Sequence, residues 1–355
     1  MRTFDYEKLA ERTWDNEILN YIAQIHEYKG KQELYIRQKP VELERLVQIA
    51  KVQSTEASNY IEGIVTTNAR LNSLMSDKTT PRNRDEEEIL GYRNVLNLVH
   101  ESYNMIPVRP NYILQMHRDL LKFTTLSYGG RFKTTQNEID EILPSGETKV
   151  LFRPVGPFET PDAVEAICES YNSAIENELV DPLLLIPCFI LDFLCIHPFN
   201  DGNGRMSRLL TLLLLYRSGY KVGQYISIEK AIADTKSVYY DALRQADSGW
   251  HTEENDPKPF IKYMLGIVLS CYREFENRVN TTEKAGIKST SYDIVRNYVS
   301  SQIGTFTKQK TLESCPTLGS SSVEAALKKL VKEGVLVRIG NGRKTHYARS
   351  DAFLK

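Results

Sequence analysis

Apolar residues recur at helical spacing along most of the chain, and this pattern predicts a mainly α-helical fold. Leu43, Leu46, Val47 and Ala50 form an i, i+3, i+4, i+7 stripe, which places apolar side chains on one face of a helix. The same reasoning predicts helices over residues 60–75, 85–103, 111–123, 161–176, 181–196, 203–217, 228–244 and 259–277. These segments predict one large helical domain.

A different pattern between residues 126 and 160 predicts a β-hairpin inserted into this domain. Two short stretches, residues 138–143 and 148–153, flank Pro144-Ser145-Gly146-Glu147, a run whose composition favours a tight turn. We therefore expect a helical bundle that carries a single hairpin.

The C-terminal residues predict a second, smaller domain. Short helical patterns over residues 292–300, 308–314 and 320–333 precede two extended stretches, 335–339 and 344–348, around an Asn-Gly turn. Helix, helix, helix and hairpin is the order of a winged helix-turn-helix domain. The expected division is an N-terminal helical region at 1–95, a catalytic core at 96–278, a polar linker at 279–290 and the winged domain at 291–355.

The charge of the chain is unevenly distributed, although its formal net value is only -1. Residues 285–355 hold 12 Lys and Arg against 5 Asp and Glu, and the rest of the chain holds 33 against 41. A basic domain suits a nucleic-acid partner, and a solvated basic face explains the charge equally well. The basic residues of the predicted recognition helix and wing are Lys328, Lys329, Lys332, Arg338, Arg343, Lys344 and His346. DNA, a docked protein and a second copy of the chain, as a homodimer, remain open as partners.

Composition and cysteine usage indicate a soluble, cytoplasmic protein without a membrane partner. Hydrophobic residues make up 41% of the chain and charged residues 26%, which is typical of soluble domains. No two of the five cysteines form a CxxC pair, so we expect reduced thiols and no disulfide framework. The N-terminal residues lack an apolar signal region, and the apolar run 183–196 is too short to span a bilayer.

The segment from His197 to Arg208, called the signature segment below, has the residues needed to hold phosphates beside a base. Its two glycines allow the backbone close to a ligand, and the start of the following helix offers free N–H groups to an anion. Arg205 and Arg208 lie three residues apart, so they share a helix face and can bind successive phosphates. Asp201 suits Mg²⁺ held against phosphates, and His197 can accept a proton from a hydroxyl.

Each of these residues also has a structural explanation when it is taken alone. A histidine after an apolar helix is commonly a hydrogen-bonding residue, and an aspartate before glycine commonly forms a turn or a helix cap. Two arginines at the start of a helix oppose its dipole, however, and this favours a phosphate site.

In this order and spacing, the signature segment resembles the signature of the Fic family (filamentation induced by cyclic AMP), H-x-F-x-D/E-G-N-G-R-x-x-R, at every fixed position. Residues 130–137 resemble the family's lead into a flap hairpin, and residues 239–243 resemble the segment after the signature. The resemblance covers residues 50–275. It implies a Fic-type helical bundle and a protein adenylyltransferase, which transfers AMP from ATP to a Ser, Thr or Tyr hydroxyl of a target protein or of itself.

The resemblance also implies roles for individual residues. His197 would be the general base, and Asp201 would hold Mg²⁺ between the α- and β-phosphates. The implied nucleotide-binding residues are Asp201, Gly202, Asn203 with its side chain, Gly204, Arg205 at the β-phosphate, Met206, Ser207 and Arg208 at the γ-phosphate, with Tyr239 and Asp247 on the adenosine side. The flap residues Ile139, Asp140, Glu141 and Ile142 would align the target by strand addition. The intact Gly202 favours AMP over other transferred groups, and the implied cofactors are ATP and Mg²⁺.

Ser58 and Glu62 lie four residues apart, followed by Gly63, and on their own they would be expected on a solvated helix face. Within a chain that resembles the Fic family they match the inhibitory motif S/T-x-x-x-E-G/N. The resemblance implies that Glu62 pairs with Arg208 and blocks productive placement of the γ-phosphate. Two alternatives remain open: Glu62 positions water for removal of AMP, or the chain is a DNA-binding regulator whose Fic domain senses nucleotide.

Overall fold

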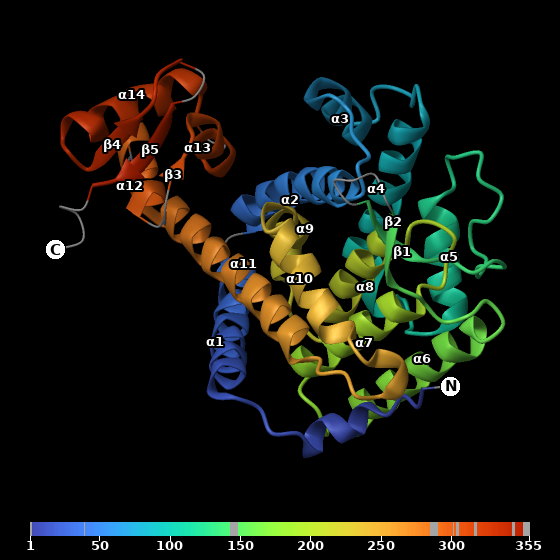
Figure 1. Cartoon of the computed structure of the whole chain (residues 1–355). Coiled ribbons are helices and arrows are strands. Elements are labelled where there is room, and N and C mark those ends of the chain that lie inside the picture. Colours follow the sequence, from blue (N-terminus) through green and yellow to red (C-terminus); the bar gives the residue numbers. More distant parts are fainter. Residues whose placement is uncertain are drawn as a thin grey trace. The chain divides into compact units, whose positions relative to one another are not determined.

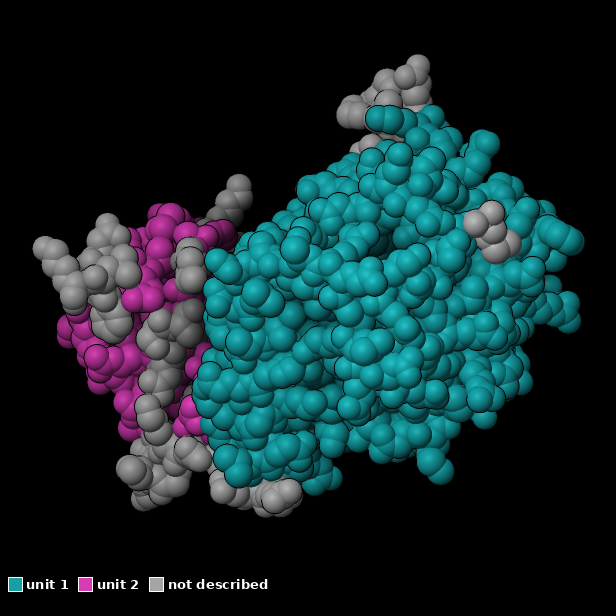
Figure 2. Space-filling view, turned by 90° about the horizontal axis from the view of Figure 1, so that it is seen from below, with its two compact units in different colours: residues 1–275 teal, residues 276–355 magenta. Residues whose placement is uncertain are grey.

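The computed structural model describes residues 2–38, 40–142, 148–284, 290–300, 302, 305–315, 318–342 and 345–350. The chain forms two compact units, residues 1–275 and residues 276–355, which are coloured separately in Figure 2. Helices dominate the chain, and the predicted mainly helical fold is confirmed (Figure 1).

The first unit is a bundle of helices with one inserted hairpin. Its α-helices are α1 (Asn16–Gln38), α2 (Pro40–Ile61), α3 (Asn68–Met75), α4 (Arg84–Ser102), α5 (Pro110–Leu120), α6 (Thr160–Glu176), α7 (Pro182–Ile196), α8 (Asn203–Arg217), α9 (Ile228–Asp234), α10 (Lys236–Asp247) and most of α11 (Lys258–Lys284). Short 3-10 helices are η1 (Tyr6–Glu11), η2 (Tyr103–Met105), η3 (Val222–Gln224) and η4 (Trp250–Thr252). The predicted hairpin is confirmed as β1 (Ile139–Ile142) and β2 (Thr148–Phe152), and its predicted turn lies outside the described residues.

Helices α7 and α8 form the core of this unit, pack against each other and are buried along nearly their whole lengths. The side chain of Asp181 caps α7 by accepting a hydrogen bond from the Leu183 N–H at 2.8 Å. Asp192 lies inside the apolar run and accepts from the Tyr6 hydroxyl at 2.8 Å and from the Trp250 indole N–H at 2.7 Å. Burial of this polar group is tolerated because it has partners. Among the described residues, no helix has the length and apolarity that a membrane crossing requires.

Two predicted domain boundaries are corrected by the structure. The boundary between residues 95 and 96 falls inside α4, which runs without a break. The expected linker at 279–290 is helical up to Lys284, because Val279 continues the apolar stripe of Cys271 and Phe275 on α11 and is only 2% exposed. Two predicted helices are also divided: residues 60–75 into the end of α2 and α3, and residues 228–244 into α9 and α10.

The second unit has the predicted succession of three helices and a hairpin. Its elements are α12 (Ser291–Ser300), β3 (Thr305–Phe306), α13 (Lys308–Ser314), α14 (Ser320–Lys332), β4 (Leu336–Ile339) and β5 (His346–Arg349). The strands form an antiparallel sheet in the order β3-β5-β4. Strand β3 was not predicted, because two residues are too few to show an alternating pattern. A separate core of Val295, Val299, Phe306, Leu327 and Leu330 holds the unit together.

Candidate active site

The signature segment spans the loop between α7 and α8, and left-handed residues stand at both ends of this loop. His197 caps α7 with φ 51°, and Gly202 precedes α8 with φ 83°. A side chain is disfavoured in this region of backbone space, so position 202 suits glycine. A Cβ atom there would also lie 3.2 Å from Cδ2 of Leu120. At His197 the strained conformation must be held by neighbouring contacts.

The N-terminus of α8 presents main-chain N–H groups that suit an anion. Gly202 at the cap position has no side chain to accept the first N–H groups of the helix. The side chain of Asn203 does not cradle them either. Its Oδ1 accepts from the Phe199 N–H at 2.9 Å, and its Nδ2 donates to the Phe199 carbonyl at 2.7 Å. Both polar groups of this side chain thus hold the loop, and its predicted contact with a phosphate stays a prediction.

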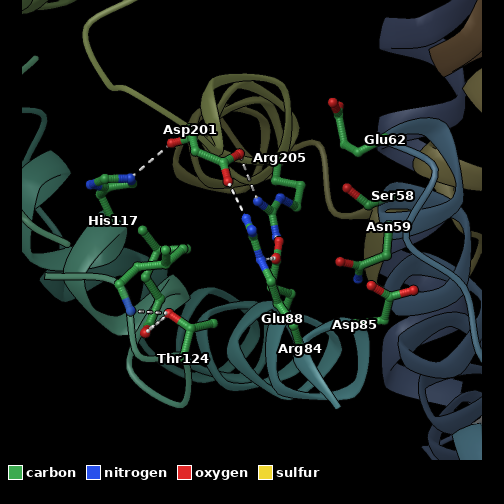
Figure 3. Close-up of polar contacts among 12 residues, drawn as sticks. Ser58, Asn59, Glu62, Arg84, Asp85, Glu88, His117, Thr124, Asp201 and Arg205 are labelled. Carbon is green, nitrogen blue, oxygen red and sulfur yellow. Dashed lines mark hydrogen bonds and ion pairs between the residues drawn. The ribbon is translucent and has the colours of Figure 1, made fainter. Parts of the chain in front are cut away.

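Arg205 belongs to a closed ring of two guanidinium and two carboxylate groups (Figure 3). Its Nη1 donates to Oε2 of Glu88 at 2.5 Å, and its Nη2 donates to Oδ1 of Asp201 at 3.2 Å. Arg84 closes the ring from α4, with Nε donating to Oε1 of Glu88 at 2.6 Å and Nη2 donating to Oδ2 of Asp201 at 3.1 Å. The ring fixes Arg205, which is 1% exposed, beside Asp201.

Arg208 lies on the same side of α8 and is bound by Ser58 of α2 and by Glu62, which directly follows α2. Its Nε donates to the Ser58 hydroxyl at 2.8 Å, and its Nη2 donates to the Ser58 carbonyl at 2.9 Å and to Oε1 of Glu62 at 2.7 Å. A Cβ atom on Gly204 would lie 2.3 Å from the same Glu62 oxygen. The Glu62 carboxylate therefore lies against the first turn of α8, where the helix favours an anion.

The end of α2 explains why glycine follows Glu62. Gly63 adopts φ 80° and donates its N–H to the Tyr60 carbonyl at 3.0 Å, while the Ile64 N–H bonds the Asn59 carbonyl at 3.0 Å. This pair of bonds is a Schellman motif, which requires a left-handed residue one position after the helix cap. Lys236 of α10 donates to the Ile61 carbonyl at 2.6 Å and adds a cation to the C-terminus of the helix.

His197 is held as a neutral imidazole. Its Nδ1 lies 3.3 Å from the Leu194 carbonyl, which can only accept, so Nδ1 carries the proton and Nε2 keeps a free lone pair. Burial lowers the pKa of His197 to about 4, and the charge of Lys133 acts in the same direction.

Two residues of the segment before the flap fix the backbone around this histidine. The Lys133 ammonium donates to the Ile196 carbonyl at 2.9 Å, and its backbone N–H donates to the Pro198 carbonyl at 2.9 Å. Asn137 donates to the carbonyls of His197 at 3.3 Å and Phe199 at 3.0 Å. Burial lowers the pKa of Lys133 to about 8. The start of the flap is therefore tied directly to the loop that carries the base.

His117 of α5 supports the loop from the side opposite Glu62 (Figure 3). Its Nδ1 accepts from the Gly130 N–H at 3.1 Å, so Nε2 carries the proton and donates to the Asp201 carbonyl at 3.0 Å. The ring stacks on Phe199 with a centroid distance of 3.7 Å. Burial lowers the pKa of His117 to about 4, so it is neutral near pH 7 and acts here by position rather than by charge.

Three further predicted nucleotide residues contribute little exposed surface. Met206 is fully buried and its N–H bonds the Gly202 carbonyl at 2.8 Å, and its nucleotide contact stays a prediction. The Ser207 hydroxyl donates to the Gly204 carbonyl at 2.8 Å. Tyr239 is buried in an aromatic cluster with Tyr240, Phe260 and Tyr263. Burial raises its pKa, and the nearby charge of Arg208 and hydroxyl of Ser207 oppose the shift. Its adenosine role stays a prediction.

Asp247 and the flap are present where the sequence predicted them, but their roles stay predictions. Asp247 ends α10, is partly buried, and has a pKa that burial raises to about 6. In the flap, Asp140 pairs with Val150 and Glu141 with Lys149 in a two-stranded antiparallel sheet, and a register shift between Ile139 and Asp140 marks an irregularity. Within the described residues this sheet has no third strand, so the hairpin offers edges for strand addition.

The site fits a cation that is shared with a ligand. In the described part of the chain, no three His, Cys, Asp or Glu side chains converge as they would in a self-sufficient metal site. Asp201, whose side chain is 34% exposed, supplies one carboxylate. Mg²⁺ is typically held by one or two carboxylates together with phosphate oxygens, so this donor set is adequate only with a phosphate ligand.

Sequence reasoning missed the supporting residues Arg84, Glu88 and His117. An Arg–Glu pair four residues apart is most often a solvated pair on a helix surface, so α4 carried no specific signal. His117 lies 84 residues from Asp201, its partner. Lys133 and Asn137 belonged to the stretch that resembles the flap lead, but nothing in their spacing indicated contact with the signature loop.

Comparison with known proteins agrees with this arrangement. Residues 107–215 match the Fic/DOC family. Among characterised proteins, the chain is 26% identical over 229 residues to "Protein adenylyltransferase Fic" of Culex quinquefasciatus, covering 62% of this chain and 41% of that protein. It is 28% identical over 187 residues to "Protein adenylyltransferase fic-1" of Caenorhabditis elegans, covering 51% and 32%. The chain thus spans less than half the length of these relatives.

Two solved structures share the fold. A Fic family protein from Desulfovibrio desulfuricans aligns with a TM-score of 0.62 at 20% identity, covering 96% of this chain and 98% of that one. A Fic-domain signaling protein from Bacteroides thetaiotaomicron aligns with a TM-score of 0.60 at 23% identity, covering 75% and 98%.

The fold and the site define a helical protein in which a helix N-terminus suited to an anion lies beside a neutral histidine. Residues 107–215 of this chain are similar to the Fic/DOC family.

Replacing Glu88 by alanine should lower the free energy of unfolding by about 3 kcal/mol, because the buried Arg205 would be left without its closest compensating carboxylate. Urea unfolding followed by tryptophan fluorescence measures this, since Trp14 and Trp250 both lie in the first unit. Glu87→Ala is the control: this neighbour has no ion pair among the described residues and should change stability by less than about 1 kcal/mol. Equal effects of the two substitutions would contradict the buried ring.

Proposed function

We propose that this protein is a protein adenylyltransferase that transfers AMP from ATP to a hydroxyl of a target protein. One observation carries the proposal: a neutral histidine with a free Nε2 stands in the same loop as an anion site built from the α8 N-terminus, Arg205 and Arg208. The relatives named adenylyltransferases support it, although the chain covers less than half of each. Reaction at a phosphate needs positioning and charge stabilisation above all, and these groups supply both.

In the proposed reaction, the polyphosphate of ATP lies across the first turn of α8. Arg205 binds the β-phosphate and Arg208 the γ-phosphate. Asp201 would hold Mg²⁺, which neutralises phosphate charge when it is bound. His197 accepts the proton of the incoming hydroxyl at Nε2, the hydroxyl oxygen bonds to the α-phosphorus, and the bond from that phosphorus to the bridging oxygen breaks. Pyrophosphate leaves, and the product is the AMP ester of the acceptor.

We further propose that the resting protein is inhibited by Glu62. Arg208 can give its Nη2 to this carboxylate or to a γ-phosphate, and the carboxylate already lies against Gly204. While Glu62 occupies Arg208, a γ-phosphate that enters the site cannot form its hydrogen bond to the Arg208 guanidinium. The position of Glu62 relative to Arg208 is fixed by a second contact, because Ser58 on the previous turn of α2 also binds Arg208. Removal of AMP with water positioned by Glu62 stays a prediction.

The target, the compartment and the assembly are also matters of proposal. The edges of the β1–β2 hairpin suit an extended segment of the target, held through main-chain hydrogen bonds. All five cysteines are free and buried, which supports a reducing, cytoplasmic setting. A homodimer stays a prediction.

Glu62→Gly should increase AMP transfer, including self-modification, by about ten- to a hundred-fold, because a charge-assisted hydrogen bond is worth about 1.5–3 kcal/mol. Incorporation of label from ATP measures the rate. Glu62→Gly combined with His197→Ala should be silent. Tyr60→Gly is the matched control, since it loosens the same last turn of α2 while keeping the carboxylate. Equal activation by Tyr60→Gly, or none by Glu62→Gly, would contradict inhibition by Glu62.

The pH profile of the Glu62→Gly variant should reflect the environment of His197. Because burial and Lys133 lower its pKa to about 4, the imidazole is neutral and able to accept a proton at all pH values above about 4. Self-modification should therefore fall only as pH drops through about 4, and not near the ordinary histidine value of about 6.5. Recovery of the full rate on return to neutral pH controls for unfolding. An acid limb near the ordinary value would contradict this assignment.

For residues 276–355, we propose a winged helix-turn-helix domain that binds DNA. A groove between α13, α14 and the β4–β5 hairpin supports this, and Lys308, Lys328 and Arg338 contribute to its lining. Glu324 pairs with both lysines and moderates their charge. Lys329 lies over the Tyr292 ring instead, and the predicted Arg343 and Lys344 are outside the described residues. Lys332 and His346 are exposed.

A double variant Lys328→Glu and Arg338→Glu should weaken binding of duplex DNA at least about tenfold and lower the salt slope by about 0.9 for each phosphate that the variant no longer neutralises. Gel shifts at several salt concentrations measure both effects. Arg296→Glu makes the same charge change as each of the two substitutions, but on α12 and outside the groove, and should have little effect. Unchanged binding by the double variant, or no binding by the wild type, would contradict a DNA-binding role for this groove.

A further inference from the structure

Two residues of α4 contact the site although they lie outside both the signature segment and the matched family region. Arg84 is the first residue of α4, and Glu88 follows one turn later. Together with Asp201 and Arg205 they form the closed ring in which positive and negative groups alternate (Figure 3). The two sides of this ring differ in exposure, and that difference indicates what each residue does.

The buried side of the ring is structural. Glu88 is 4% exposed at its side chain and Arg205 is 1% exposed, with 2.5 Å between Oε2 and Nη1. A buried guanidinium needs a compensating charge and fixed geometry, and Glu88 supplies both. Glu88 is thus a positioning residue, because it sets the direction in which Arg205 presents its remaining N–H groups.

The open side of the ring is exchangeable. The Arg84 side chain is 59% exposed and that of Asp201 is 34% exposed. Arg84 is anchored by Nε, which donates to Glu88 at 2.6 Å, while its Nη2 reaches Asp201 at 3.1 Å. If the Asp201 contact breaks, the Glu88 contact still keeps the guanidinium beside the site. An isolated surface ion pair would lack this buried anchor.

Each oxygen of Asp201 already accepts a bond from one arginine, Oδ1 from Arg205 and Oδ2 from Arg84. A cation at Asp201 would repel both guanidinium groups, and the exposed Arg84 can move away more easily than the buried Arg205. Phosphate oxygens that share the cation would lie close to this carboxylate. The Nη2 of Arg84, once released from Asp201, would be available to them, and a planar guanidinium forms strong charge-assisted bonds to phosphate.

We propose that Arg84 is a third phosphate-binding arginine of this site, which exchanges Asp201 for a phosphate oxygen of the bound nucleotide while Glu88 keeps it in place. The inference rests on the proposed function only in so far as the ligand is a nucleotide. AMP transfer itself is not needed for the test.

The test is the affinity of Arg84→Met for ADP with saturating Mg²⁺, measured by isothermal titration calorimetry. ADP lacks the γ-phosphate, so occupation of Arg208 by Glu62 does not complicate the result. Removal of one charge-assisted bond should weaken ADP binding about tenfold. Arg84→Lys keeps the charge but lacks the planar guanidinium, so its ADP affinity should lie between those of the wild type and Arg84→Met. Arg82→Met removes the same charge two residues away, from an exposed side chain, and should change affinity by less than about twofold because solvent screens it.

Adenosine is the second probe, because it has the base and ribose but no phosphate. Arg84→Met should leave its binding unchanged, as followed by ligand-observed NMR, if Arg84 contacts phosphate. Equal weakening for ADP and adenosine would assign Arg84 a structural role and overturn the proposal. So would an equal effect of Arg84→Met and Arg82→Met on ADP, or a wild type that does not bind ADP. Reduced ADP affinity without any detectable AMP transfer would sink the proposed function and leave this inference standing.

Discussion

Arg208 is a buried cation at the first turns of a helix whose dipole already carries positive potential, and it must therefore have an anionic partner. It is 3% exposed, so solvent compensates little of its charge. In the structure the partner is Glu62, delivered by the end of α2. The end of α2 meets this need in two ways: Ser58 binds the same guanidinium one turn before Glu62, and the left-handed Gly63 ends the chain's helical path directly after Glu62.

Arg205 is also a buried cation and also needs an anionic partner, but it has two. The first carboxylate, that of Glu88, is buried, and the second, that of Asp201, is partly exposed. The two arginines of the signature segment thus differ in kind. Arg205 has a buried partner in Glu88, whereas the carboxylate partner of Arg208, Glu62, is partly exposed. Under the proposed function, Arg205 would keep its direction when a nucleotide binds, and Arg208 would exchange Glu62 for a phosphate.

The local parts of this site could be predicted from the sequence, because their chemistry depends on short, fixed spacings. His197, Asp201, Arg205 and Arg208 fall within one loop and one helix turn, and Ser58 and Glu62 fall within one turn of α2. The β1–β2 hairpin and the elements of the second unit could likewise be predicted, from hydrophobic periodicity and from turn residues. In each case the relevant signal extended over fewer than about twenty residues.

The remaining features depend on contacts between distant segments, which no local pattern encodes. Arg84 and Glu88 look like an ordinary surface pair until α4 is placed beside α8. The two bonds of the Asn203 amide to the Phe199 backbone likewise become visible only in the folded loop. The expected linker was misjudged because polar residues obscure the apolar stripe that carries α11 on to Val279.

The central claim is that Arg208 binds either the Glu62 carboxylate or a γ-phosphate, but not both at once. The ratio of the affinities for ATP and ADP tests this most directly. Affinities for both nucleotides would be measured in a His197→Ala background, which prevents transfer, with and without Glu62→Gly. With Glu62 present the γ-phosphate should add little, so ATP and ADP should bind within about twofold; without it ATP should bind about tenfold more tightly than ADP. An equal preference for ATP in both proteins would contradict the account.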